Sequence, residues 1–177
     1  MRMLRRVLLL CVCAVLLAAV PATAGLFGDK FEDEVVTETS AVKLVREVQQ
    51  GGYDVVTTEE LKGWIDGGRK MIIVDTMPFE ASYAKGHIPG AVPFEFPVPL
   101  METWDTTKTA GKSPADYEAL LGSDKDMLIV VYCGFVKCTR SHNGAIWAKK
   151  LGYTNVVRHP GGIFAWKGKG YPVETAE

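Results

Sequence analysis

The chain has 177 residues, of which 47% are apolar and 23% are charged, a composition that excludes a protein disordered along its whole length. The length is that of about one domain. Its 20 basic and 21 acidic residues nearly balance, and the absence of a basic excess argues against a nucleic-acid partner.

The first 24 residues have the pattern of a Sec-type signal peptide. Arginines precede an apolar run of 14 residues, Val7 to Val20, and the small residues Ala-Thr-Ala end at Ala24. A membrane anchor is less favoured, since a bilayer span needs about 20 apolar residues. Twin-arginine export and lipoprotein processing are minor alternatives. Cleavage near Ala24 predicts a periplasmic or secreted protein without a stable membrane span, with 17 basic and 21 acidic residues left.

After the signal peptide, we interpret residues 25–39 as a linker, because glycine and acidic residues alternate there without a period. Residues 40–177 form the predicted domain. It begins with a helical extension, because Ala41, Leu44, Val45 and Val48 have the spacing of one helix face. This helix is expected to end at Gly51.

A short strand and a capped helix are predicted within "YDVVTTEELKGWIDGG", where Thr57 and Glu60 have the spacing of a capping box. The next segment, "MIIVDT", is apolar throughout and predicts a strand covered on both faces that ends near Asp75. The segment "FEASYAKGHIPGAVPF" predicts a short helix, a turn and another strand.

Residues 95–123 are less regular and predict a long surface loop that covers a site, followed by a helix with Ser113 as N-cap and Pro114 in its first turn. A strand "MLIVVY", a helix over residues 141–151, a strand "NVVRH" and a tail complete the chain. Alternating strands and helices predict one α/β domain with a mainly parallel sheet.

Two cysteines lie in the loop between the strand "MLIVVY" and the next helix. Cys133 follows the strand directly, where parallel sheets place their ligand sites, and a helix N-terminus comes soon after it. Loop amides, Lys137 and Arg140 are expected to lower the pKa of Cys133 and to bind an anion, while Gly134 permits a sharp turn. The structural alternatives are a plain disulfide with Cys138 and a buried, inert Cys133.

The run "TTEELKGWIDGG…MIIVDT…YAKGHIPGAV…IVVYC…RS…AKKLGYTNV…PGGIFAWKGKGYPVE" resembles the rhodanese-like domain family. The resemblance implies a doubly wound α/β fold with a five-stranded parallel sheet and helices on both faces. It also implies a sulfurtransferase that carries sulfane sulfur as a persulfide on Cys133. We expect no cofactor, and the three scattered histidines do not predict a metal site. By position, Arg140 is the basic residue that closes the family's loop, and Asp75 and His87 match positions near the site.

The loop departs from the family pattern in its length and in its second cysteine. Cys133 to Arg140 makes eight residues, against six in typical family sulfurtransferases and seven in the related phosphatases. The expected substrate-binding loop comprises Gly134, Phe135, Val136, Lys137, Cys138 and Thr139.

Cys138 is a candidate resolving thiol that attacks a persulfide on Cys133 and releases the sulfur. The expected partners are a small sulfur-containing anion as donor, a thiol or cyanide-like acceptor, and a redox protein. The alternatives are a phosphatase or arsenate-type enzyme that uses the same loop, and a non-catalytic module that binds sulfur or protein.

Overall fold

The computed structural model describes residues 28–176, so the predicted signal peptide lies outside the described residues. Residues 28–38 belong to one compact unit and residues 39–176 to another. The helix α1 (Gly28–Gly51) includes most of the predicted linker, so the expectation of an irregular segment there is wrong. Acidic residues early in a helix stabilise it through the helix dipole, and the sequence following Gly28 is rich in them. Within residues 28–176, no helix is long and apolar enough to cross a membrane.

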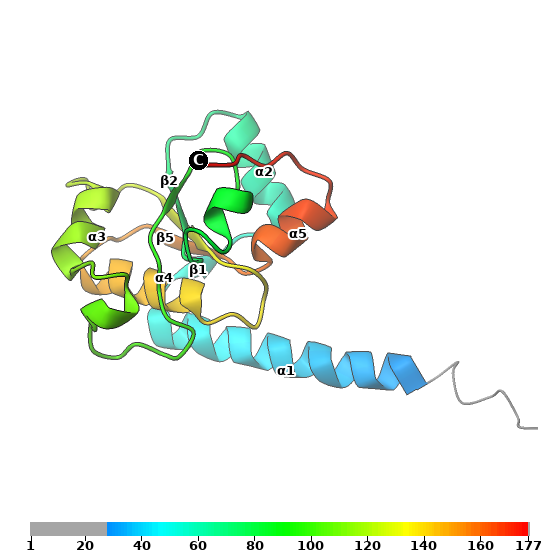
Figure 1. Ribbon diagram of the computed structural model, residues 1–177. Coiled ribbons are helices and arrows are strands. Elements are labelled where there is room, and N and C mark those ends of the chain that lie inside the picture. Colours follow the sequence, from blue (N-terminus) through cyan, green and yellow to red (C-terminus); the bar gives the residue numbers. More distant parts are fainter. Residues whose placement is uncertain (1–27, 177) are drawn as a thin grey trace, which may run out of the picture. The chain divides into compact units, whose positions relative to one another are not determined.

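Five parallel strands form one sheet in the order β1-β5-β4-β2-β3, which confirms the predicted doubly wound fold (Figure 1). The strands are β1 (Asp54–Val55), β2 (Ile72–Asp75), β3 (Ala91–Pro93), β4 (Ile129–Tyr132) and β5 (Val156–His159). The strand β4 is central, and its last residue Tyr132 is in register with Asp75 and His159. Cys133 therefore lies at the middle of the carboxyl edge of the sheet, where ligand sites of this fold class form.

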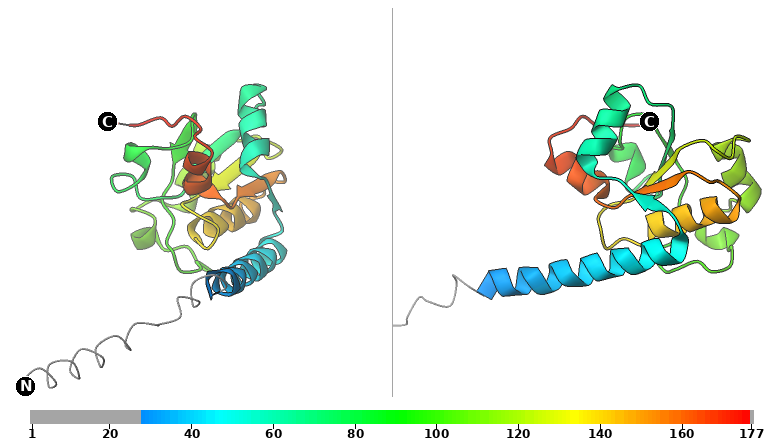
Figure 2. Two further views of the ribbon diagram at one scale, coloured as in Figure 1. Left: turned by 90° about the vertical axis from the view of Figure 1, so that its right-hand side faces the viewer. Right: turned by 180° about the vertical axis from the view of Figure 1, so that it is seen from behind.

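Helices cover both faces of the sheet (Figure 2). Residues of α3 (Pro114–Leu121) and α4 (Arg140–Lys150) pack into the hydrophobic core on one face, and residues of α2 (Thr58–Asp66) and α5 (Gly162–Gly168) into the core on the other. Alternate β4 side chains enter the two cores, Ile129 and Val131 one and Val130 and Tyr132 the other. A strand buried on both faces explains the unbroken apolar run in the sequence.

Two helix starts confirm the local sequence signals. Thr57 and Glu60 form a complete capping box at α2, in which each side chain accepts from the main-chain N–H of the other. Ser113 and Asp116 do the same at α3, with Pro114 in its first turn. Short-range capping of this kind depends only on neighbouring residues, so it is readable without the fold.

The irregular segment after β3 contains the single-turn helix η2 (Thr106–Lys108), and a second single-turn helix, η1 (Tyr83–Lys85), precedes β3. Asn143 of α4 holds the segment, since its amide donates to the carbonyls of Pro97 and Pro99 at 2.8 Å each. Trp104 packs against the aromatic core beside Trp147. The side chain of Trp104 is therefore part of the core packing.

Candidate functional site

The cysteine loop, residues Cys133–Thr139, connects β4 to the first residue of α4. Both thiols are free in the structure. The two residues differ in exposure: Cys133 has 0% of its surface accessible and Cys138 has 7%. Both residues are buried, and of the two only Cys138 keeps a small accessible surface.

The sulfur of Cys133 faces hydrogen-bond acceptors inside the protein. It lies 3.4 Å from the carbonyl oxygen of Cys138, 3.9 Å from that of Phe135 and 3.1 Å from the hydroxyl of Ser141. We call this the inner side of the loop. Burial, followed by the neighbouring thiol of Cys138, raises the pKa of Cys133 well above its ordinary value. The expectation that the loop lowers the pKa of Cys133 is therefore wrong, because burial and the Cys138 thiol outweigh the hydrogen bonds of Ser141, which act to lower it.

The sulfur of Cys138 has the opposite surroundings, which we call the outer side of the loop. The neighbouring Cys133 side chain lowers the pKa of Cys138 to about 6. Burial opposes this shift, and the main-chain N–H groups of Arg140 and Gly134 support it. Thr139, the N-cap of α4, makes no side-chain capping bond. Arg140 is the first residue of α4, and its N–H has no partner within the helix, so it can donate to the thiolate.

A buried guanidinium supports the inner side. The side chain of Arg158, on β5, is 0% exposed and donates to the carbonyls of Val136 and Cys138 at 3.3 and 2.9 Å. Its Nε donates to Ser141 Oγ at 2.8 Å, and it pairs with the carboxylate of Glu47 at 2.5 Å. These bonds orient the loop carbonyls toward the interior. Arg158 therefore holds the backbone of the cysteine loop in place.

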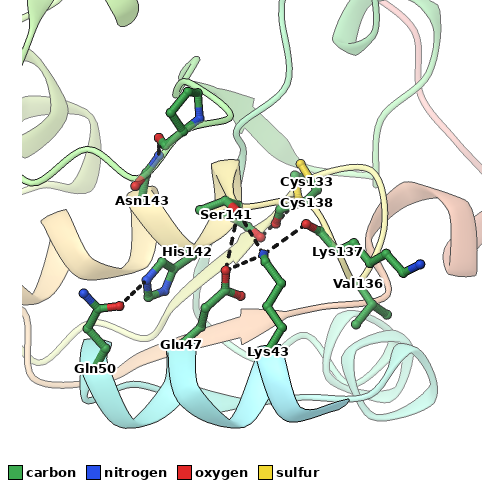
Figure 3. A network of polar contacts seen from close by, with 12 residues as sticks. Lys43, Glu47, Gln50, Cys133, Val136, Lys137, Cys138, Ser141, His142 and Asn143 are labelled. Carbon is green, nitrogen blue, oxygen red and sulfur yellow. Dashed lines mark hydrogen bonds and ion pairs between the residues drawn. The ribbon is translucent and has the colours of Figure 1, made fainter. Parts of the chain in front are cut away.

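The C-terminal half of α1 holds the loop from the same direction (Figure 3). Lys43 Nζ donates to the carbonyl of Lys137 at 3.0 Å and to Thr139 Oγ1 at 2.9 Å, and it also pairs with Glu47. Although burial acts to raise it, hydrogen bonds from Lys43 and Arg158 hold the pKa of Glu47 below its ordinary value. Glu47 is therefore the anion that joins the helix cation to the buried guanidinium.

A histidine behind this network is neutral at neutral pH. His142 accepts or donates at Nδ1 to the hydroxyl of Tyr53 at 2.7 Å, and its Nε2 lies 3.3 Å from Gln50 Oε1 (Figure 3). Burial lowers the pKa of His142 to about 4. It contributes hydrogen bonds to the packing of α1 on α4 and no positive charge at that pH.

The two cations expected to bind an anion are placed differently from the prediction. The side chain of Lys137 is exposed and points away from the cysteines, so only its carbonyl belongs to the site (Figure 3). The guanidinium of Arg140 donates to the carbonyl of Phe96 and lies 3.6 Å from Glu95. The expected pair of cationic side chains around the loop is therefore absent from the described residues, although Arg140 still lowers the pKa of Cys138 through its charge.

The other loop residues have distinct positions. Phe135 is 44% exposed and its ring packs against that of Phe164, which is 61% exposed, with centroids 5.4 Å apart. Val136 contributes its carbonyl to Arg158. An exposed aromatic pair, formed by one residue of the loop and one of α5, therefore stands at the loop.

The start of α5 packs directly on the loop and demands a glycine. The N–H groups of Ile163 and Phe164 donate to the carbonyls of Cys133 and Gly134 at 2.9 and 3.0 Å. Gly162 has a φ of 59°, and a Cβ there would lie 2.1 Å from the carbonyl oxygen of Cys133. Gly134 itself would meet nothing closer than 3.7 Å, so the position that requires glycine is Gly162 and not, as expected, Gly134.

Asp75 and His87 shape the strand ends and make no hydrogen bond to either thiol in the described part of the chain. Asp75 accepts from the amide of Met77 at 2.8 Å, and burial raises its pKa. His87 stacks on Tyr83 with ring centroids 3.8 Å apart and bonds the carbonyl of Tyr83. Their expected place behind the site stays a prediction. Among residues 28–176, no group of three or more His, Cys, Asp or Glu is placed to hold a metal ion.

Sequence reasoning missed the support of the loop, namely Arg158, Glu47, Ser141 and Lys43. Arg158 had a usable signal, since it is a lone charge in the apolar strand "NVVRH", and a buried charge requires a partner. Glu47 lies beside Val48 on the apolar stripe of the helix. Nothing in the sequence pairs the two, because 111 residues separate them.

Comparison with known proteins identifies the domain. The family model of the rhodanese-like domain matches residues 57–169. Rhodanese-like domain-containing protein 14, chloroplastic, from Arabidopsis thaliana is 30% identical over an alignment of 132 residues that covers 60% of this chain. The match spans 58% of the length of that relative.

Solved structures share the fold at low sequence identity. Thiosulfate sulfurtransferase from Pseudomonas aeruginosa superposes with a TM-score of 0.56 at 21% identity, over 78% of this chain and 23% of that one. A protein of unknown function from Rhodopseudomonas palustris, described as a possible tyrosine phosphatase, superposes with a TM-score of 0.50 at 24% identity, over 74% and 93%. These likenesses show the fold alone.

Proposed function

The chain belongs to the rhodanese-like domain family, and we propose that it is a sulfurtransferase that takes up sulfane sulfur as a persulfide on a cysteine of the loop. The observation that carries the proposal is the placement of one loop thiol, that of Cys138, against two main-chain N–H groups at the carboxyl edge of the sheet. Such N–H groups stabilise a thiolate and, after transfer, the anionic end of a persulfide.

The carrier in this proposal is Cys138, whereas the sequence analysis favoured Cys133. Three features support Cys138: partial exposure, the amides of Gly134 and Arg140, and the neighbouring Cys133 side chain, which lowers its pKa. Cys133 has no exposure and faces carbonyl oxygens. A nucleophile must be ionised and reachable, and of the two thiols Cys138 has the lower pKa and the larger exposure.

The transfer consists of two displacements. The Cys138 thiolate attacks the outer sulfur of a donor such as thiosulfate, a bond forms between the two sulfurs, and the donor bond breaks with its electron pair leaving on sulfite. An acceptor such as cyanide then attacks the outer sulfur of the persulfide, thiocyanate departs, and the thiolate returns with the electron pair of the broken bond. No cofactor is required.

Intact mass tests the carrier. After incubation with sodium tetrasulfide and removal of the excess, Cys133→Ser is expected to gain the mass of one sulfur atom, and Cys138→Ser is expected to gain none. Cyanide added to the loaded protein should yield thiocyanate in proportion to the sulfur carried. Absence of any sulfur gain in the wild type and in both variants would refute the proposed function.

A phosphatase is the second candidate, supported by the eight-residue loop and by the fold shared with the possible tyrosine phosphatase of Rhodopseudomonas palustris. The directions of the cationic side chains argue against a phosphatase. The guanidinium of Arg140 contacts Phe96 and Glu95, and that of Arg158 donates to the loop carbonyls. Phosphoryl transfer needs such groups on the equatorial oxygens. A phosphate-ester assay beside the thiocyanate assay separates the two reactions.

A non-catalytic module is the third candidate, in which the loop binds a partner and the thiols are inert. The lowered pKa of Cys138 argues against inertness. Labelling of the reduced protein with iodoacetamide at neutral pH discriminates, because a binding module without a reactive thiol would remain unmodified.

The proposal also includes the export of the protein from the cytoplasm. We propose that residues 1–24 direct the protein out of the cytoplasm, on the basis of their arginines, apolar run and small residues. Fractionation of cells that express the full chain, with N-terminal sequencing of the product, tests it. A cytoplasmic product that keeps its first residues would contradict the proposal.

A further inference from the structure

The two cysteines of the loop are both buried, and Cys133 has no contact with solvent. The thiol of Cys133 donates to the main-chain carbonyl of Cys138 at 3.4 Å. Figure 3 shows the two residues side by side at the end of β4. A donor molecule therefore cannot reach Cys133, and the group placed to react with it is whatever Cys138 carries.

We propose that Cys133 is a resolving thiol, which attacks the persulfide on Cys138, releases hydrosulfide and leaves a disulfide between the two cysteines. This inference rests on the proposed function, since it requires a sulfur on Cys138. It adds a second activity to transfer: the reduction of sulfane sulfur to sulfide. The activity suits a chain with no other described cysteine.

The step balances without an added reactant. The sulfur of Cys133 forms a bond to the sulfur of Cys138, and the bond between Cys138 and the outer sulfur breaks. The outer sulfur takes that electron pair together with the proton of Cys133, and it leaves as hydrosulfide. The sulfane sulfur is reduced, and the two thiols are oxidised to a disulfide. A dithiol reductant, small or protein-borne, must then restore the pair.

Ser141 is positioned to help Cys133 lose its proton. Its hydroxyl oxygen accepts from Arg158 Nε at 2.8 Å and lies 3.1 Å from the sulfur of Cys133. With its oxygen engaged by Arg158, the hydroxyl hydrogen is directed to a remaining acceptor, and the thiolate that develops on Cys133 is one. Arg158 also polarises this hydroxyl, so the buried network behind the loop serves the resolving step.

The loop carbonyls keep Cys133 protonated until a persulfide is present. The carbonyl of Cys138 lies 3.4 Å from the sulfur and receives the S–H at rest. Uptake on Cys138 thus precedes resolution, because a protonated Cys133 does not compete for the donor. The division of labour comes from the surroundings of each sulfur and not from the order of the cysteines in the chain.

A single-turnover experiment tests the inference. Reduced protein, freed of reductant, is mixed with sodium tetrasulfide, passed rapidly through a desalting column, and followed by intact mass and by sulfide release. The wild type is expected to release sulfide stoichiometrically and to end lighter by the mass of two hydrogen atoms, with Cys133 and Cys138 linked in a peptide map. Cys133→Ser is expected to keep the extra sulfur and to release no sulfide.

Two further variants keep the outcome interpretable. Cys133→Ala repeats the test with an apolar side chain, and circular dichroism checks that each variant folds. Ser141→Ala is expected to slow sulfide release while sulfur uptake continues, which a merely structural role would not separate.

The competing outcomes are distinct. If the wild type holds its extra sulfur as long as Cys133→Ser does, the resolving role is refuted while the proposed function stands. If Cys133→Ser fails to load and Cys138→Ser loads, the assigned roles are refuted. If no protein loads, the proposed function fails.

Discussion

On the inner side of the cysteine loop, Cys133 lies among carbonyl oxygens and a serine hydroxyl, whereas on the outer side Cys138 lies against two main-chain N–H groups. The same loop thus raises the pKa of one thiol and lowers that of the other. Position at the end of a central strand does not by itself make a cysteine reactive. Burial, the neighbouring thiol and the nearest peptide groups together set the pKa of each cysteine.

The largest effect is expected from breaking the support of the inner side. Arg158→Met removes five hydrogen bonds and leaves Glu47 buried beside one remaining cation. Loss of one partner of a buried ion pair costs about 3 to 5 kcal/mol in the free energy of unfolding. Denaturant titration of the wild type and of Arg158→Met measures this difference in the free energy of unfolding.

The matched control for Arg158→Met is Arg46→Met, which removes an exposed cation from α1. Its effect on the free energy of unfolding is expected to stay within about 0.5 kcal/mol. Equal effects of the two substitutions would show that the buried guanidinium does not support the loop.

Selective alkylation measures the contrast between the two thiols. At neutral pH, Cys138 is mostly thiolate and Cys133 almost wholly protonated, because their pKa values are shifted in opposite directions. Iodoacetamide is expected to label Cys138 at least about a hundredfold faster than Cys133, as read from peptide mass maps over time. The control is labelling in denaturant, where the fold no longer shifts the pKa of either thiol and the two rates should be similar. Faster labelling of Cys133 in the folded protein would overturn the comparison.

The pH dependence of the alkylation rate tests the lowered pKa of Cys138 more closely. A thiol loses its proton as the pH rises, and the pKa of Cys138 is about 6. The labelling rate at Cys138 is therefore expected to rise about tenfold between about pH 5 and pH 7 and then to level off. A rate that keeps climbing to about pH 9, the range of an ordinary cysteine, would contradict the lowered pKa.

The smallest effect is expected at the contact between α1 and the loop. Lys43→Met removes the bonds to the Lys137 carbonyl and to Thr139 Oγ1, and it leaves Glu47 paired with Arg158 alone. Because Lys43 is 37% exposed, the cost in the free energy of unfolding is expected to be about 1 kcal/mol or less. Amide hydrogen exchange of the cysteine loop should quicken in Lys43→Met and not in Arg46→Met. Unchanged exchange in both variants would show that α1 does not hold the loop.

Features that depend on neighbouring residues could be predicted from the sequence. The capping boxes of Thr57 and Ser113 involve partners three residues away, and the buried strand "MLIVVY" is readable from its apolar run. The parallel direction of the strands followed from the alternation of strands and helices. The predicted linker failed because a polar helix carries too weak an apolar period to be recognised.

The site was harder to predict, because its geometry depends on distant pairs. The location of the cysteine loop at the carboxyl edge of the sheet followed from the strand before it. The direction of the Arg140 and Lys137 side chains did not, since each is set by a contact or by solvent that sequence spacing does not encode. Gly162 likewise requires glycine because of a loop that precedes it by many residues.

The sequence by itself determined the family, the α/β architecture, the edge of the sheet on which the site stands, and the presence of two cysteines within one loop. The tertiary structure alone decided which sulfur meets N–H groups and which meets carbonyl oxygens. The physical reason is that Arg158, paired with Glu47 from a helix 111 residues away, turns the loop carbonyls inward. The spacing of residues that are close in the sequence does not encode the direction of these carbonyls.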